Sequence, residues 1–168
     1  CLLRVPAAGR VGKASARMMT ATGGADRLRQ ILEEFYRICE IPHPSAGEYA
    51  LSCYLRSRLL EKTRHVRRDR SGNLMAVLPP KNASAAAPMV TLQAHMDMVV
   101  AGDVIPSRMR IIPRCEGDWL CSDGSTSLGA DNGIGLAVIL HLLEQEDIVH
   151  GPLQILFTVC EEQGLKGA

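Results

Sequence analysis

Hydrophobic positions along the chain follow first a helical and then a strand period. Apolar residues recur at helical spacing over residues 28–39, and the Pro-His-Pro of residues 42–44 ends this predicted helix. Ser45 and Glu48 have the spacing of a capping box, in which each side chain bonds a free backbone N–H. A second helix is therefore expected to run to about Glu61.

Strand-like runs begin after this second helix. Residues 65–69 and 73–78 are short runs joined by a turn-forming stretch that contains Gly72, which predicts a hairpin. Residues 89–94 are apolar in the manner of a buried central strand, and residues 153–159 form a second run of the same kind. Such strands need cover on both faces of their sheet.

One helix and one irregular stretch lie between these two runs. Residues 132–144 are apolar nearly all round, as expected for a helix packed between other elements. Residues 99–127 show no clear period and have turn-forming residues at 116–118. Strands that alternate with helices predict an α/β fold, here a partial three-layer sandwich with a mostly parallel central sheet. In such sheets, ligands gather at the carboxyl ends of the strands.

The composition is that of an ordinary globular protein and excludes several partner classes. The 168 residues are 46% hydrophobic and 22% charged, with a net charge of +1. Because acidic and basic residues are mixed, we expect no nucleic acid and no membrane as partners. The longest apolar runs also fall short of the roughly 18 to 20 residues of a membrane-spanning helix.

Cysteine usage and the two chain ends suggest how the chain is organised. Six cysteines form no CxxC pair and lie among apolar segments, which favours reduced, buried thiols and a cytoplasmic setting. Residues 1–25 carry basic residues but no Asp or Glu, so we expect a disordered or mispredicted leader, with a targeting peptide as the alternative. Residues 26–168 are the predicted folded portion, cut off after a strand.

The first candidate site follows the strand of residues 89–94. His95 and Asp97 lie two positions apart, where strand alternation directs both side chains to the same face. Imidazole is a good zinc ligand, and a nearby carboxylate commonly accepts its second N–H. His95 is therefore a candidate metal ligand that Asp97 orients. The alternative is a strand end capped by a hydrogen-bonded histidine.

Acidic residues mark two further strand or helix ends. Asp131 precedes a helix with a glycine on each side, and it is either an ordinary N-cap or a carboxylate that bridges two metal ions. Glu161 and Glu162 follow the strand of residues 153–159, where two desolvated acids would repel. One of them could bind metal while the other acts as general base, unless both are solvated. The residues alone do not order this pair.

Three motifs resemble those of the aminoacyl-histidine dipeptidase family. They occupy residues 92–99, 128–135 and 161–168, and the similarity continues upstream through residues 38–45 and 69–73. The family comprises Xaa-His and cytosol non-specific dipeptidases, which are two-zinc exopeptidases. The resemblance implies that the chain is the amino-terminal part of a zinc-exopeptidase catalytic domain.

The resemblance also assigns the site residues. It implies that His95 ligates one zinc, that Asp131 bridges both, and that Glu162 ligates the other. Glu161 would be the general base, and Asp97 would orient His95. Two Zn²⁺ ions are implied for a complete site, with Co²⁺ or Mn²⁺ as substitutes.

The implied function is hydrolysis of small dipeptides, of the Xaa-His type or more broadly, by a protein that forms a homodimer at full length. The family requires further metal ligands and a lid domain beyond residue 168, so we expect the chain alone to be inactive. Residues 123–129 are one residue longer than the family's stretch and residues 100–114 match poorly, so the substrate-side loops differ. Alternatives are an N-acyl amino acid deacylase and a non-catalytic interaction module.

Overall fold

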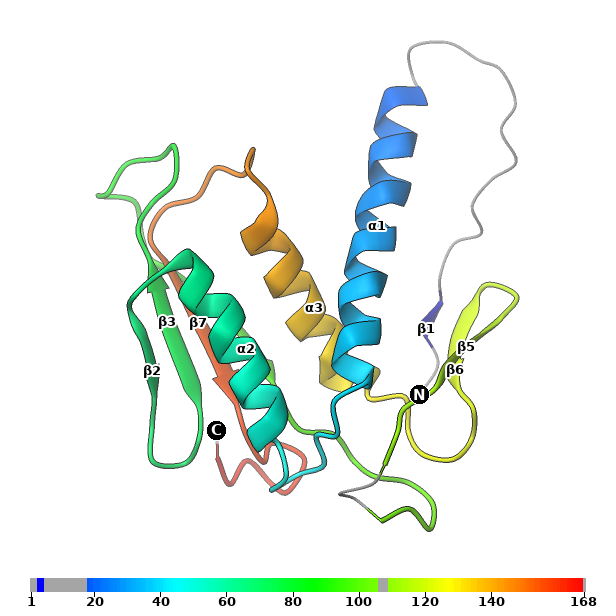
Figure 1. Ribbon diagram of the computed structural model, residues 1–168. Coiled ribbons are helices and arrows are strands. Elements are labelled where there is room, and N and C mark those ends of the chain that lie inside the picture. Colours follow the sequence, from blue (N-terminus) through cyan, green and yellow to red (C-terminus); the bar gives the residue numbers. More distant parts are fainter. Residues whose placement is uncertain (1–2, 5–17, 106–108, 168) are drawn as a thin grey trace.

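The computed structural model describes residues 3–4, 18–105 and 109–167, and it confirms the predicted α/β class (Figure 1). In chain order the elements are β1 (Leu3–Arg4), α1 (Met18–Cys39), α2 (Tyr49–Lys62), β2 (Val66–Arg68), β3 (Leu74–Leu78), β4 (Val90–His95), β5 (Pro113–Glu116), β6 (Trp119–Ser122), α3 (Ala130–Glu144) and β7 (Leu153–Thr158).

The three predicted helices are present, and α2 and α3 have nearly the expected bounds. The helix α1 begins earlier than its apolar period indicates, because it includes Met18 and the residues that follow. Of the predicted leader, residues 18–25 therefore belong to α1, and residues 3–4 pair with β6. The rest of that segment lies outside the described residues.

The central sheet has the strand order β2-β3-β7-β4 and is mixed. The strands β4 and β7 run parallel, whereas β3 is antiparallel to both β2 and β7. The short turn between β2 and β3 allows only an antiparallel pair, while the longer crossover through α3 allows β4 and β7 to run parallel. The expected parallel character is thus confined to the β4–β7 pair.

Two expectations for the individual strands had different outcomes. The strand β7 is central and buried, as predicted, because it lies between β3 and β4. The prediction of a buried central strand is wrong for β4 within the described sheet, where β4 is an edge strand and Val90 is 51% exposed. Only its last two residues, Ala94 and His95, are buried.

All three helices lie on one face of this sheet (Figure 1). The buried side chains of β3 and β7 face them, in the register pairs Leu74 with Phe157 and Ala76 with Ile155. The alternate residues, such as Met75 and its partner Leu156, are half-buried on the opposite face. The described residues thus form two layers of the predicted three-layer sandwich.

The stretch that lacked a clear period contains a small second sheet. The strands β5 and β6 form an antiparallel hairpin, and β1 pairs with β6. The predicted turn at residues 116–118 is confirmed: Gly117 has a φ of 60°, in the left-handed region that favours glycine. The two strands around it were not predicted.

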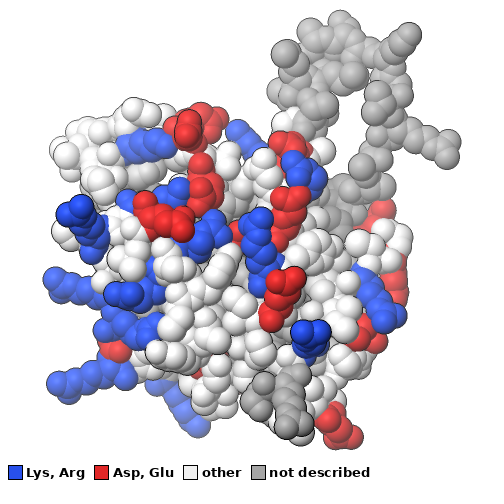
Figure 2. All heavy atoms as spheres, viewed as in Figure 1, with Lys and Arg blue, Asp and Glu red and all other residues white. Residues whose placement is uncertain are grey.

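Charged side chains protect the β2 edge of the central sheet. Arg64, Arg67, Arg68 and Arg70 in and beside β2 are exposed. Figure 2 shows basic side chains gathered along this edge of the molecule, with acidic and basic side chains mixed over the helices. Charge on an edge strand discourages pairing with another chain, so this cluster has a structural explanation.

Two further sequence expectations concern membranes and thiols. No helix among the described residues combines the length and apolar character needed to cross a bilayer. Five cysteines in the described part of the chain are free, as predicted, but Cys53 and Cys115 are exposed rather than buried.

Glu34 joins the three helices through a buried carboxylate. This residue of α1 is 4% exposed and accepts hydrogen bonds from Tyr54 and, at 3.0 Å, from Arg58, both on α2. Arg58 also reaches Glu144 of α3 at 3.0 Å. Burial raises the pKa of Glu34, but the hydrogen bonds from Tyr54 and Arg58 outweigh it and hold the pKa below its usual range.

Glu34→Gln should destabilise the protein by about 2 kcal/mol at pH 7, because it removes the buried charged acceptor of Tyr54 and Arg58. The pKa of Glu34 is lowered in the folded state. The stabilisation by ionised Glu34 is therefore fully present above the ordinary carboxyl pKa of 4.5, and it is lost as the pH falls through the lowered pKa of the folded state. Urea unfolding at pH 7 and pH 3 measures both effects. The exposed Glu33→Gln is the control, and a difference that stays constant between the two pH values would contradict this account.

Candidate metal centre

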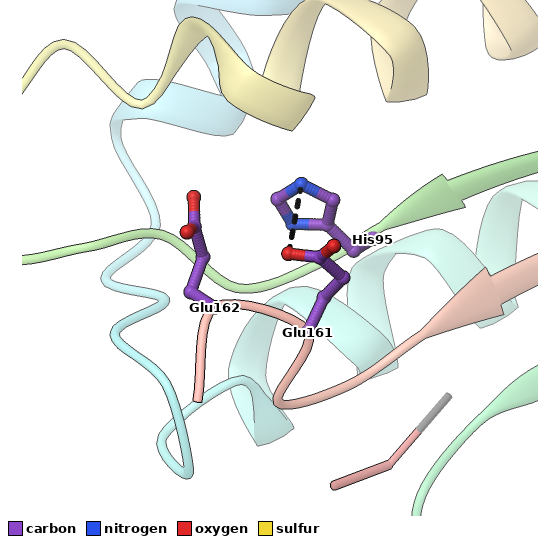
Figure 3. A group of neighbouring side chains, drawn as sticks. All are labelled: His95, Glu161 and Glu162. Atoms are coloured by element: carbon purple, nitrogen blue, oxygen red, sulfur yellow. Dashed lines mark ion pairs between the residues drawn. The ribbon is translucent and has the colours of Figure 1, made fainter. Parts of the chain in front are cut away.

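The parallel pairing of β4 with β7 brings the candidate site residues to one edge of the sheet. The two strands end side by side, with His95 opposite Thr158. Asp97 follows β4, and Glu161 and Glu162 lie in the loop that follows β7, close to the end of β4 (Figure 3). The helix α3 packs against β4, and its first turn supplies Asp131.

The hydrogen bonds of His95 determine which ring nitrogen is available. His95 is 5% exposed, and its Nδ1 lies 2.9 Å from the backbone oxygen of Asp97. Because a carbonyl can only accept, Nδ1 carries the proton and donates it. The opposite atom, Nε2, lies 3.0 Å from Asp131 Oδ1 and 3.9 Å from Glu161 Oε2. The ring therefore directs Nε2 toward two carboxylates.

This arrangement fits a bound cation. An unprotonated Nε2 and a carboxylate oxygen are both acceptors, so they need a proton or a cation between them. One ligand atom each from His95, Glu161 and Glu162 lies within 4.8 Å of the other two. Imidazole nitrogen and carboxylate oxygen are ligands that suit zinc. The donor set of the site residues therefore fits a divalent metal.

Asp97 acts mainly on the loop of Glu161 and Glu162. Its side chain is fully buried, and Oδ1 accepts a hydrogen bond from Glu161 N at 2.9 Å. Oδ2 accepts from Glu162 N at 3.2 Å and from Ser45 Oγ at 2.7 Å. The Asp97 carboxylate is 3.6 Å from His95 Nδ1, which is too far for a hydrogen bond, and the ring N–H donates to the Asp97 backbone oxygen instead.

Asp131 does not cap its helix in the way the alternative required. Asp131 and Asn132 interrupt the helical backbone at the start of α3, where Asp131 has non-helical φ and ψ of −91° and 107°, and the Asp131 carboxylate contacts His95 Nε2. The Asp131 side chain is 73% exposed. This leaves the Asp131 carboxylate available for a ligand.

The glycines around Asp131 have a packing explanation. A Cβ at Gly129 would lie 3.0 Å from Met98 Sδ, and one at Gly133 would lie 2.9 Å from the Phe35 ring. Gly129 also has a φ of 66°. The fold therefore accounts for both glycines, because a larger side chain at either position would collide with the core.

Ser45 and Glu48 contribute to the site in a way that sequence analysis missed. The predicted capping box is wrong: α2 has Glu48 at its N-cap but no side-chain cap hydrogen bond. The Ser45 hydroxyl is bonded to Asp97, and the Glu48 carboxylate accepts from the backbone N–H of Cys160 at 3.0 Å. The Ser-x-x-Glu spacing signalled these two residues but not their partners.

A cavity of about 320 Å³ opens beside Glu162. Its wall is largely apolar and includes Pro44, Met98, Val99 and Val100. An apolar cavity next to candidate metal ligands is the arrangement expected where a small substrate binds.

These features define an α/β chain with metal-binding geometry at the carboxyl ends of two parallel strands. A family model described as Peptidase family M28 matches residues 73–168, and this chain belongs to that family. Metal dependence comes with membership in this family of metallopeptidases, whereas the identity of the metal does not.

Similarity to individual proteins agrees with the resemblance seen in the sequence. The chain is 43% identical over 138 residues to the cytosol non-specific dipeptidase of Escherichia coli (strain K12), across 80% of this chain and 28% of that protein. The crystal structure of aminoacylhistidine dipeptidase from Vibrio alginolyticus matches with a TM-score of 0.75 and 38% identity, over 82% of this chain and 29% of that chain. A tripeptidase from Staphylococcus aureus matches with a TM-score of 0.71 and 28% identity, over 82% and 38%.

The predicted resemblance to aminoacyl-histidine dipeptidases is thereby confirmed. The chain spans less than a third of the length of the Escherichia coli and Vibrio alginolyticus proteins. The family model covers residues 73–168, which carry His95, Asp131 and the two glutamates.

Asp97→Asn should destabilise the protein by about 2 kcal/mol, because an amide presents one oxygen and two N–H donors to three groups that all donate. Urea unfolding at pH 7 measures the loss. The exposed Asp103→Asn is the matched control and should change stability by less than about 0.5 kcal/mol. Equal stability of the two variants would show that the three hydrogen bonds to Asp97 are unimportant.

Proposed function

We propose that this chain is part of the catalytic domain of a zinc-dependent dipeptidase that cleaves Xaa-His or a broader range of dipeptides. The observation that carries the proposal is that His95, at the end of β4, lies close to the carboxylates of Asp131, Glu161 and Glu162. The names of the Escherichia coli and Vibrio alginolyticus relatives support a dipeptide substrate.

In this proposal His95, Asp131 and Glu162 would hold two zinc ions. The contact between His95 Nε2 and Asp131, and the short distances from His95 to the glutamates, support these assignments. Co²⁺ or Mn²⁺ can replace zinc at such ligands. Zinc held there supplies positive charge that polarises the scissile carbonyl and acidifies a nearby water.

Glu161 is the general base of the proposed reaction. Its carboxylate lies beside His95 Nε2, and its backbone is fixed by the hydrogen bond to Asp97. It accepts the proton of the attacking water at a carboxylate oxygen and later donates that proton to the departing amine. The assignment of base and ligand within the Glu161-Glu162 pair rests on the family resemblance.

The remaining parts of the proposal concern the setting of the whole protein. A cytoplasmic location is supported by the free cysteines and by the name of the Escherichia coli relative. The cavity beside Glu162 is the proposed place of a substrate side chain, since its walls are apolar and it adjoins a metal ligand. A homodimer at full length remains a prediction from the resemblance.

Glu161→Gln should lower kcat by about 10²- to 10⁴-fold, because it removes the proton acceptor while it leaves the proposed metal ligands in place. The test is hydrolysis of Xaa-His dipeptides by the whole protein, expressed from its complete reading frame, with bound zinc measured in parallel. Glu146→Gln is the control, because this exposed glutamate follows the end of α3 opposite to Asp131. If the protein cleaved N-acetyl amino acids faster than dipeptides, its function would be that of a deacylase instead. If Glu161→Gln left kcat unchanged, Glu161 would not be the general base.

A further inference from the structure

Glu48 is a buried carboxylate whose hydrogen bonds reach the loop of the candidate site. It is 5% exposed, and its Oε1 accepts from Ala46 N at 3.1 Å and from Cys160 N at 3.0 Å. The Cys160 thiol lies 3.5 Å from the same oxygen. Burial of a carboxylate is costly unless the carboxylate is hydrogen-bonded, so these hydrogen bonds offset the cost of burying Glu48.

The loop after β7 presents three consecutive backbone N–H groups to two buried carboxylates. Cys160 N donates to Glu48, whereas Glu161 N and Glu162 N donate to Asp97. Cys160 has a φ of 51°, in the left-handed region that a non-glycine residue adopts only at a cost. The two carboxylates therefore hold a turn that the chain would not favour by itself.

The segment before α2 approaches both sides of this arrangement. Met98 N donates to the backbone oxygen of His43 at 3.1 Å, and Ser45 Oγ donates to Asp97 Oδ2 at 2.7 Å. Glu48 completes the contact by reaching Cys160, 112 residues away in the chain. One short segment thus touches the end of β4 and the loop that follows β7.

A simple capping role does not account for Glu48. The helix α2 has no side-chain cap hydrogen bond, although Glu48 occupies its N-cap position. A carboxylate at a helix N-terminus is favoured by the helix dipole, which stabilises its charge there. Glu48 Oε1, however, accepts hydrogen bonds from the backbone N–H groups of Cys160 and Ala46, which lie outside the helix.

We infer that Glu48 is a positioning residue for the metal centre: it fixes the turn at Cys160 and so sets where Glu161 and Glu162 lie relative to His95. The expected effect of Glu48 on metal affinity rests on the proposed function. The expected effect of Glu48 on the backbone of the loop does not. Partners that orient metal ligands contribute strongly to metal binding even though they do not touch the ion.

The test combines amide hydrogen exchange with zinc titration of the whole protein, expressed from its complete reading frame, and of three variants. Glu48→Ala removes the acceptor, Glu48→Gln retains a carbonyl oxygen of the same reach, and Glu61→Ala removes an exposed glutamate from the same helix as a control. In Glu48→Ala, exchange of the Cys160 amide should be about tenfold faster, while amides of Ile155 and Phe157 in β7 exchange at the wild-type rate. Zinc affinity should fall about tenfold or more.

Glu48→Gln should restore slow exchange at Cys160 and most of the zinc affinity, and Glu61→Ala should behave as the wild type. Equal acceleration at Cys160 and in β7 would overturn the inference, because it would show a loss of overall stability. Unchanged exchange at Cys160 would overturn it as well. If the wild-type whole protein bound no zinc, the proposed function would fail, while the exchange data would still decide whether Glu48 holds the loop.

Discussion

The parallel pairing of β4 with β7 is the constraint on which the candidate site depends. In a parallel pair both strands end at the same edge of the sheet, so the residues that follow them meet. If the same strands were antiparallel, their carboxyl ends would be separated by roughly the length of a six-residue strand, about 20 Å. His95 and the Glu161-Glu162 pair could then share no ion. The crossover through α3 makes the parallel arrangement possible, and α3 itself brings Asp131 to His95.

Buried carboxylates then turn this coarse placement into a defined geometry. Asp97 and Glu48 are nearly inaccessible, and together they accept hydrogen bonds from the backbone of residues 160–162. Backbone N–H groups are good partners for buried acids, because they offset part of the negative charge and no second charged side chain has to be buried. The glutamates of the site are thereby fixed through their backbone, which leaves their side chains available for metal and substrate.

The sequence predicted the helices, the first hairpin and the residues of the site, because each depends on local pattern. It did not predict that β4 lies at the edge of the described sheet, since an apolar run does not show which strands flank it. The role of Glu48 was hidden because its partner Cys160 is distant in the chain, and the Ser45–Glu48 spacing also fits a helix cap. The packing role of Gly129 and Gly133 was hidden for a similar reason: their neighbours Met98 and Phe35 come from other parts of the chain.

X-ray absorption spectroscopy of the zinc-loaded chain tests the central claim most directly. The account predicts a first shell of nitrogen and oxygen at about 2.0 to 2.1 Å, with an imidazole contribution that His95→Ala abolishes. The chain also contains six cysteines that could compete for zinc. A sulfur shell at about 2.3 Å, or an imidazole signal that survives the loss of His95, would contradict a metal centre at the ends of β4 and β7.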